Sequence, residues 1–111
     1  MSAYDAEYQR NWYQKNKKEH LARVKARNKA YRREMRAYVG FLKATKPCTD
    51  CGIFYPPYVM QFDHLRDKFM EVSIMITKMY SRDRILAEID KCELVCANCH
   101  AVRTHKRLNG A

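Results

Sequence analysis

The stretch "CELVCANCH", residues 92–100, places three cysteines and a histidine within nine residues. Its Cys96-x-x-Cys99 pair has a counterpart upstream in "KPCTDCG", residues 46–52. Each C-x-x-C pair puts two thiolates on one tight turn, and two such knuckles complete a four-thiolate zinc site. The spacing predicts a structural Zn²⁺ that ties the start of a small domain to its end, held by Cys48, Cys51, Cys96 and Cys99.

Cys92 is a fifth cysteine, and its spacing to Cys96 would also serve a metal site. The two regular knuckles form the better ligand set. We therefore expect Cys92 to be a small buried hydrophobic residue.

The chain has 111 residues, which suits one domain with or without an appendage. A chain of this size buries a modest core, and a metal staple would support it. No apolar run is long enough to span a membrane, and the N-terminal residues lack the apolar stretch of a signal peptide. We expect a soluble cytoplasmic protein without a membrane partner, and in such a reducing compartment paired cysteines favour metal over disulfides.

The formal charge of +10 is unevenly spread. Residues 1–47 hold thirteen Lys and Arg against four Asp and Glu, whereas residues 48–111 hold nine against eight. This asymmetry predicts a basic arm that meets a polyanion, most simply DNA. The alternative is a solvated helix whose charges only aid solubility. The arm residues that we expect to contact DNA are Arg23, Arg27, Arg32 and Arg33.

Residues 1–46 are predicted to form this arm as one long helix, because they lack proline and are rich in good helix formers. The segment 14–20 is a candidate bend. Apolar residues recur at steps of three and four between Leu21 and Leu42, interrupted by Asn28. We expect the C-terminal part of the helix to pack on the domain at 47–111. The same stripe could instead join two copies as a coiled coil, so both a monomer and a homodimer are compatible with it.

The rest of the chain predicts an α+β domain of short elements. Residues 58–62 read as a strand, 66–73 as a returning strand or an irregular link, and 74–80 as a short helix or strand. Ser81 is a good N-cap for a helix over 82–92. The tail at 97–108 predicts a final helix that Asn109 and Gly110 end.

The segment "FDHL", residues 62–65, is not explained by a structural zinc, and neither is His100, which directly follows a zinc ligand. Together with the two knuckles, these residues make the chain from Cys48 to Lys106 resemble the HNH nuclease family in its zinc-knuckle form. The resemblance covers roughly the last 60 residues and lies in the combination of motifs. It implies a small ββα-metal (His-Me finger) domain, stapled by the four-cysteine zinc site and preceded here by the long basic helix.

The resemblance also implies roles. His64 matches the general base that activates water, and Asp63 and His100 match the ligands of a catalytic Mg²⁺ or Mn²⁺. The implied function is a metal-dependent endonuclease or nickase that hydrolyses DNA, with duplex DNA preferred, in a bacterial or phage-infected cell. On a regular strand Asp63 and His64 point to opposite faces, so a local distortion is expected to turn both toward one cleft. The candidate phosphate contacts on the last helix are Arg103, Lys106 and Arg107, and His105 is either another contact or a further metal ligand.

One position departs from the family. A middle Asn that orients the loop carrying the base commonly lies nine residues before the last metal ligand, and here that position is Lys91. Another group is then expected to orient His64. Two other functions stay open: a non-catalytic zinc-stabilised nucleic-acid-binding module, and an interaction protein that associates through its helix. The binding module does not need the combination of Asp63, His64 and His100. This combination therefore distinguishes the nuclease from the binding module.

Overall fold

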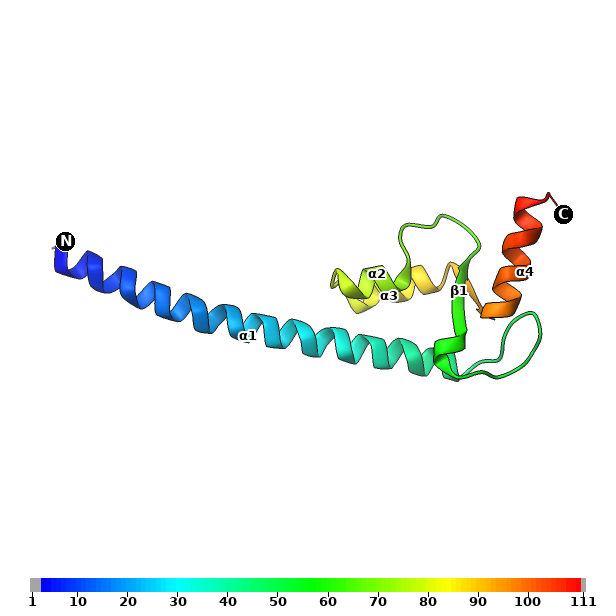
Figure 1. The fold of residues 1–111 in the computed structure, drawn as a ribbon, viewed down its shortest axis with the longest axis horizontal. Helices are drawn as coiled ribbons and strands as arrows, with labels where there is room; N and C mark the ends of the chain where they lie inside the picture. The colour runs from blue at the N-terminus through cyan, green and yellow to red at the C-terminus, as the bar shows by residue number, and fades with distance from the viewer. Residues whose placement is uncertain (1–2, 111) are drawn as a thin grey trace. The chain divides into compact units, whose positions relative to one another are not determined.

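The computed structural model describes residues 3–110. Its elements are, in order, α1 (Ala3–Ala44), the 3₁₀ turn η1 (Pro57–Val59), β1 (Met60–His64), α2 (Val72–Thr77), α3 (Arg82–Ile89), β2 (Cys92–Cys96) and α4 (Ala97–Leu108) (Figure 1). Residues 1, 2 and 111, which the predicted domain ranges include, lie outside the described part. The chain divides into two compact units, residues 1–31 and 32–111. This boundary lies within α1, and the functional division at residue 46 stays a prediction.

The long N-terminal helix is confirmed, and it runs without a break through residues 14–20, where we expected a possible bend. Within that segment, the side-chain amide of Asn16 donates to the carbonyl of Trp12 at 2.7 Å. Four large side chains of the first unit, Tyr8, Trp12, Tyr13 and Leu21, are more than half exposed. Among the described residues, none of the helices combines the length and the apolar character that a bilayer crossing needs.

The last three turns of α1 belong to the second unit. Met35 and Val39 are buried there, and the Nε of Arg32 donates to the carbonyl of Thr77, the last residue of α2, at 3.1 Å. The guanidinium of Arg82 stacks 4.0 Å from the ring centroid of Tyr38. The C-terminal part of the helix therefore packs on the domain that follows it, as its apolar stripe predicts.

Two antiparallel strands form the sheet, and their pairing is one-to-one from Met60 opposite Cys96 to His64 opposite Cys92. The first strand begins two residues later than predicted, because residues 57–59 form a 3₁₀ turn. The second strand lies at residues 92–96, whereas the sequence offers residues 66–73 as the returning strand and places Cys92 in the preceding helix. Leu94, Val95 and Cys96 are all buried, so this strand lacks the alternation of apolar and polar residues that identifies a half-exposed strand.

The remaining segments follow the sequence closely. Residues 65–71 form an irregular link and residues 72–77 a helix, which resolves two open predictions. Ser81 caps α3, since its hydroxyl accepts from the backbone N–H of Arg84 at 3.3 Å. The final helix ends at Leu108, and Gly110 follows in the left-handed region with a φ of 66°. Figure 1 shows α2 beside α3, and α4 on the other side of the strands.

Apolar side chains are buried at both ends of this unit. The sheet end has a core of Cys48, Met60, Leu94, Val95 and Cys96. The helical end buries Val72, Met75, Ile76 and Ile85. Thr49 of the first knuckle makes two hydrogen bonds to the sheet. Its backbone N–H and its hydroxyl both donate to the carbonyl of Leu94, at 2.9 and 2.8 Å.

Candidate functional site

The four paired cysteines lie together, with their Sγ atoms all within 4.8 Å of one another. The first knuckle is a tight turn in which the N–H of Gly52 donates to the carbonyl of Cys48 at 2.9 Å, and Gly52 adopts a φ of 74° that favours glycine. The second knuckle opens α4, where Cys96 is the N-cap and its sulfur accepts from the N–H of Cys99. Four thiols at this separation could hold one Zn²⁺.

Backbone N–H groups favour the thiolate form of one of the four cysteines, Cys48. Burial opposes ionisation of the Cys48 thiol, but the N–H groups of Cys51, Cys96 and Asp50 outweigh it and lower its pKa to about 6. One of these bonds, from Cys96 N to Cys48 Sγ, measures 3.3 Å and joins the two knuckles directly. A thiolate is the form that zinc binds.

Cys92 lies apart from the cluster. It is half-buried, its sulfur donates to the carbonyl of Glu88 at 3.4 Å, and burial raises its pKa to about 11. The residue therefore stays a protonated thiol inside the fold, in keeping with the hydrophobic role expected for it.

Asp63 is the centre of a second cluster, in which its side chain on β1 contacts residues of α4. Its carboxylate is 3% exposed and accepts a bidentate pair of hydrogen bonds from Arg107, at 2.7 and 2.6 Å. Arg103 adds a third bond at 2.8 Å. These guanidinium groups, Arg107 first, lower the pKa of Asp63 to about 2 despite its burial.

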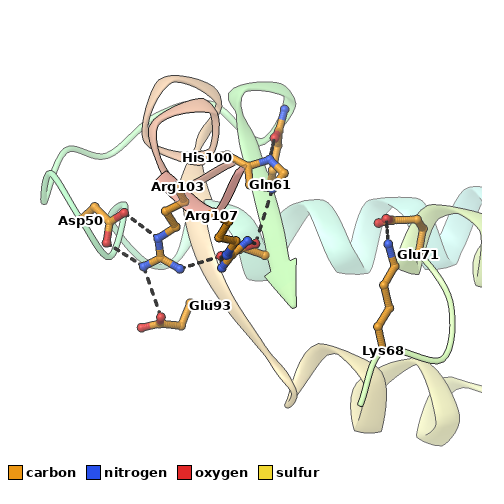
Figure 2. A network of polar contacts seen from close by, with 9 residues as sticks. Asp50, Gln61, Lys68, Glu71, Glu93, His100, Arg103 and Arg107 are labelled. Carbon is orange, nitrogen blue, oxygen red and sulfur yellow. Dashed lines mark hydrogen bonds and ion pairs between the residues drawn. The ribbon is translucent and has the colours of Figure 1, made fainter. Parts of the chain in front are cut away.

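Arg103 links Asp63 to the first knuckle. Its Nε and Nη2 donate to the two carboxylate oxygens of Asp50 at 2.7 and 2.6 Å, and Nη2 lies 3.2 Å from Glu93 Oε1 (Figure 2). Three acidic side chains therefore share one partly buried guanidinium. The position of Arg103 is fixed by the fold more firmly than that of Arg107, which is half exposed.

His100 joins the Asp63 cluster from the first turn of α4. Its Nε2 lies 3.5 Å from Asp63 Oδ1, and its Nδ1 contacts Gln61 Oε1 (Figure 2). The structure thus brings together Asp63 and His100, which come from elements far apart in the sequence. His105, weighed as a further ligand, is exposed near the end of α4, where its Nδ1 contacts the Asn109 amide at 3.3 Å.

His64 does not join that cluster. The strand pairing is one-to-one through His64, so β1 contains no bulge, and adjacent side chains point to opposite faces. The expected distortion that would turn Asp63 and His64 toward one cleft is therefore absent from β1. The His64 Nε2 instead lies 2.9 Å from Oε2 of Glu88, a buried carboxylate on α3 that sequence reasoning did not single out.

Lys91 lies beside this pair. Its ammonium donates to Glu88 Oε1 and to the carbonyl of Asp67, both at 3.0 Å. Glu88 also accepts from the backbone N–H groups of Phe69 and Met70, at 2.9 and 3.4 Å. The residue that stands at the family's Asn position thus reaches the link after β1. The one sequence signal for Glu88 is a carboxylate on the apolar side of a short helix, next to the buried Ile85.

A cleft of about 740 Å³ opens beside His100. One wall comes from the end of α1 with Arg36 and Lys43, and the other comes from α2. Gln61 and Phe62 of β1 also line it, and the Lys43 ammonium lies 5.2 Å from the ring centroid of Phe62. Arg36 and Lys43 outnumber the one acidic residue on its walls, Glu71, so the cleft is suitable for an anionic group.

The basic residues predicted to bind DNA fall into two groups. Arg103, Arg107 and Arg32 already donate to partners within the domain. The others are exposed: Arg23, Arg27, Arg33 and Lys106. These four exposed side chains fit a phosphate-binding role better than the three arginines that already donate within the domain.

Comparison with protein-family models, with curated proteins and with solved structures finds no match to this chain. Its function must therefore be inferred from its own residues and their arrangement.

Proposed function

We propose that this protein is a metal-dependent endonuclease or nickase that hydrolyses phosphodiester bonds in DNA. In this proposal Asp63 and His100 hold a catalytic Mg²⁺ or Mn²⁺, His64 is the general base, and the four-cysteine cluster holds a structural Zn²⁺. The observation that carries it is the convergence of Asp63 and His100, 3.5 Å apart, on a unit of two antiparallel strands followed by a helix.

The donor set fits a divalent ion. A carboxylate oxygen and an imidazole nitrogen suit a Lewis-acid divalent ion, and two protein ligands leave positions for water and phosphate. The carboxylate of Asp63 is ionised and surrounded by cationic groups. When bound, the ion would polarise the phosphodiester and stabilise the leaving oxygen.

The chain's own residues supply the other functions. Cys99 precedes His100 directly, so a filled zinc site fixes the backbone of this ligand. His64 is the proposed proton acceptor for water, because a neutral imidazole can take a proton near neutral pH. Arg36 and Lys43 on the cleft walls are placed to receive the phosphates of the bound strand.

The second candidate is a DNA-binding module without catalysis. It is favoured by the saturation of Asp63 with three guanidinium hydrogen bonds and by the contact of His64 with Glu88 on the other face of the sheet. In that case Arg103 and Arg107 would replace the ion permanently. The basic arm and the zinc cluster would serve both functions equally.

Plasmid nicking separates the two. Zinc-loaded wild type should nick DNA with Mg²⁺ or Mn²⁺, and His64→Ala should lose roughly 10²–10⁴-fold in rate at unchanged zinc content and DNA affinity. Asp63→Ala and His100→Ala should also stop cleavage, and more Mn²⁺ should partly restore them but not His64→Ala. A wild type that nicks neither duplex nor single-stranded DNA above the His64→Ala background, with Mg²⁺, Mn²⁺ or Ni²⁺, would establish the binding module instead.

A further inference from the structure

Glu88 is a buried carboxylate that neither the zinc cluster nor the Asp63 cluster uses. It is 3% exposed, and donors from three different segments face it. His64 Nε2 and the backbone N–H groups of Phe69 and Met70 lie 2.9, 2.9 and 3.4 Å from Oε2, and the Lys91 ammonium lies 3.0 Å from Oε1. A carboxylate this deeply buried needs such compensation to stay charged.

We propose that Glu88 is the positioning residue for His64: it holds the imidazole as the Nε2–H tautomer and leaves Nδ1 as the nitrogen that accepts a proton. An ionised carboxylate accepts hydrogen bonds and donates none, so a contact of 2.9 Å places the hydrogen on Nε2. The bond then fixes both the tautomer and the ring orientation. The catalytic part of this inference rests on the proposed function, whereas the tautomer does not.

The surroundings of Glu88 keep it in the accepting form. Burial opposes its charge, but hydrogen bonds from Lys91, from the Phe69 N–H and from His64 lower the pKa of Glu88 to about 2. Lys91 itself has no acceptor atom and cannot take over the role of an amide that accepts from the base. It acts instead through Glu88, and it also holds the carbonyl of Asp67 in the link that follows β1.

The same carboxylate organises the segment around the base. Its Oε2 accepts hydrogen bonds from His64, at the end of β1, and from the backbone N–H groups of Phe69 and Met70 in the link. The carboxylate itself belongs to α3. Glu88 therefore does for His64 what the HNH pattern assigns to its middle Asn, from a position three residues before Lys91. A merely structural carboxylate would stabilise the link and would leave the tautomer and the turnover number unaffected.

The direct test is the protonation of His64 in the full-length, zinc-loaded wild type. Long-range ¹H–¹⁵N NMR at pH 8, above the ordinary imidazole pKa of about 6.5, should show a protonated Nε2 and a bare Nδ1. The Nε2 proton should be protected from exchange, and His64→Gln identifies the signal. A hydrogen on Nδ1, whether the ring is neutral or doubly protonated, overturns the assignment.

Variants of Glu88 test the positioning role in catalysis. Glu88→Ala should lower kcat for nicking by roughly 10- to 100-fold at unchanged KM and DNA affinity, and it should expose the Nε2 proton to exchange. Glu88→Gln keeps one accepting oxygen and should recover part of both properties. Asp83→Asn is the matched control, because it removes an exposed carboxylate from the same helix.

The outcomes separate this inference from the proposed function. An unchanged kcat in a folded, zinc-replete Glu88→Ala protein overturns the positioning role. If Glu88→Ala fails to fold, the kcat of Glu88→Gln tests the positioning role, and the wild-type NMR spectrum tests the tautomer. A wild type that cleaves no DNA overturns the proposed function alone, and the NMR measurement then still decides the tautomer that Glu88 imposes.

Discussion

Arg107 and Asp63 form a bidentate ion pair in which Nη1 meets Oδ1 at 2.7 Å and Nη2 meets Oδ2 at 2.6 Å. The carboxylate is buried, whereas the Arg107 side chain is 51% exposed. A half-exposed guanidinium therefore contacts both oxygens of the residue that we propose as a ligand of the divalent ion. Ion and guanidinium would compete for the same charge.

We predict that Arg107→Met raises the affinity for Mn²⁺ several-fold, because it removes this competitor and leaves the Asp63 charge in place. Titration followed by Mn²⁺ electron paramagnetic resonance would measure it. Lys106→Met is the matched control, since it removes an exposed neighbouring cation that makes no bond to Asp63, and Asp63→Asn should abolish the site. An Mn²⁺ affinity that is unchanged or lower in Arg107→Met contradicts the competition.

Zinc removal should unfold the second unit. Structural zinc supplies folding free energy on the order of 10 kcal/mol in small domains, and the cluster joins Cys48 at the start of this unit's sheet core to Cys99 at its last helix. We expect one zinc per chain by elemental analysis, and loss of both the metal and the cooperative thermal transition in Cys48→Ser or Cys96→Ser.

Cys92→Ser provides the control for the zinc prediction. Cys92 lies outside the cluster and donates to a backbone carbonyl, a bond that a serine hydroxyl can also make. This variant should keep its full zinc content. Folded protein without zinc, or loss of zinc from Cys92→Ser, would show that the ligand set is wrong.

Two Lys–Glu pairs with the same spacing should differ in their contribution to stability. Lys91 pairs with the buried Glu88, and Lys68 pairs with the exposed Glu71. Lys91→Met should lower the free energy of unfolding by about 1–3 kcal/mol, since it leaves a buried charge less compensated. Lys68→Met should cost well under 1 kcal/mol. Chemical denaturation of the zinc-loaded variants measures both, and equal costs would mean that Lys91 is only a surface charge.

The pH dependence of this difference has a defined sign. The pKa of Glu88 is lowered to about 2, so its contribution is fully present above the ordinary glutamate pKa of about 4.3 and is lost as the pH falls toward 2. The difference between wild type and Lys91→Met should therefore shrink as the pH falls from about 4.3 toward 2. The nicking rate of Lys91→Met should fall if Lys91 supports the base loop through Glu88.

The first unit should carry much of the non-specific DNA affinity. Residues 1–31 contain eight Lys and Arg, and the boundary at Tyr31 spares the buried Met35 and Val39. Deleting this segment should make the plot of log K against log salt shallower, because fewer counterions are released on binding. In the full-length protein, Arg23→Gln with Arg27→Gln should reduce the slope by about 2 if both residues contact phosphates.

Fluorescence anisotropy with labelled duplex over a range of salt concentrations measures these slopes. The deletion variant must retain its zinc and its thermal transition for the comparison to hold. Equal slopes for the deletion and for wild type would show that the arm is a solvated helix, and the exposed cations of the second unit, such as Arg33 and Lys106, would then be the electrostatic contact.

The sequence by itself determined the local features of this protein. Helix formers without proline specify α1, the hydroxyl of Ser81 specifies the start of α3, and two C-x-x-C spacings specify the cysteine knuckles. Each of these depends on neighbours within a few residues, whose chemistry can be read along the chain. The second strand could not be identified in this way, because its consecutive buried residues reflect cover on both faces.

Only the tertiary structure decided which distant side chains meet. Asp63 and His64 are neighbours in sequence, yet a regular strand sends one to the arginines of α4 and the other to Glu88 on α3. Glu88 is one carboxylate among many until the fold buries it and surrounds it with four donors. Desolvation and hydrogen-bond geometry are properties of that enclosure, and they turn an ordinary glutamate into the partner of the proposed base.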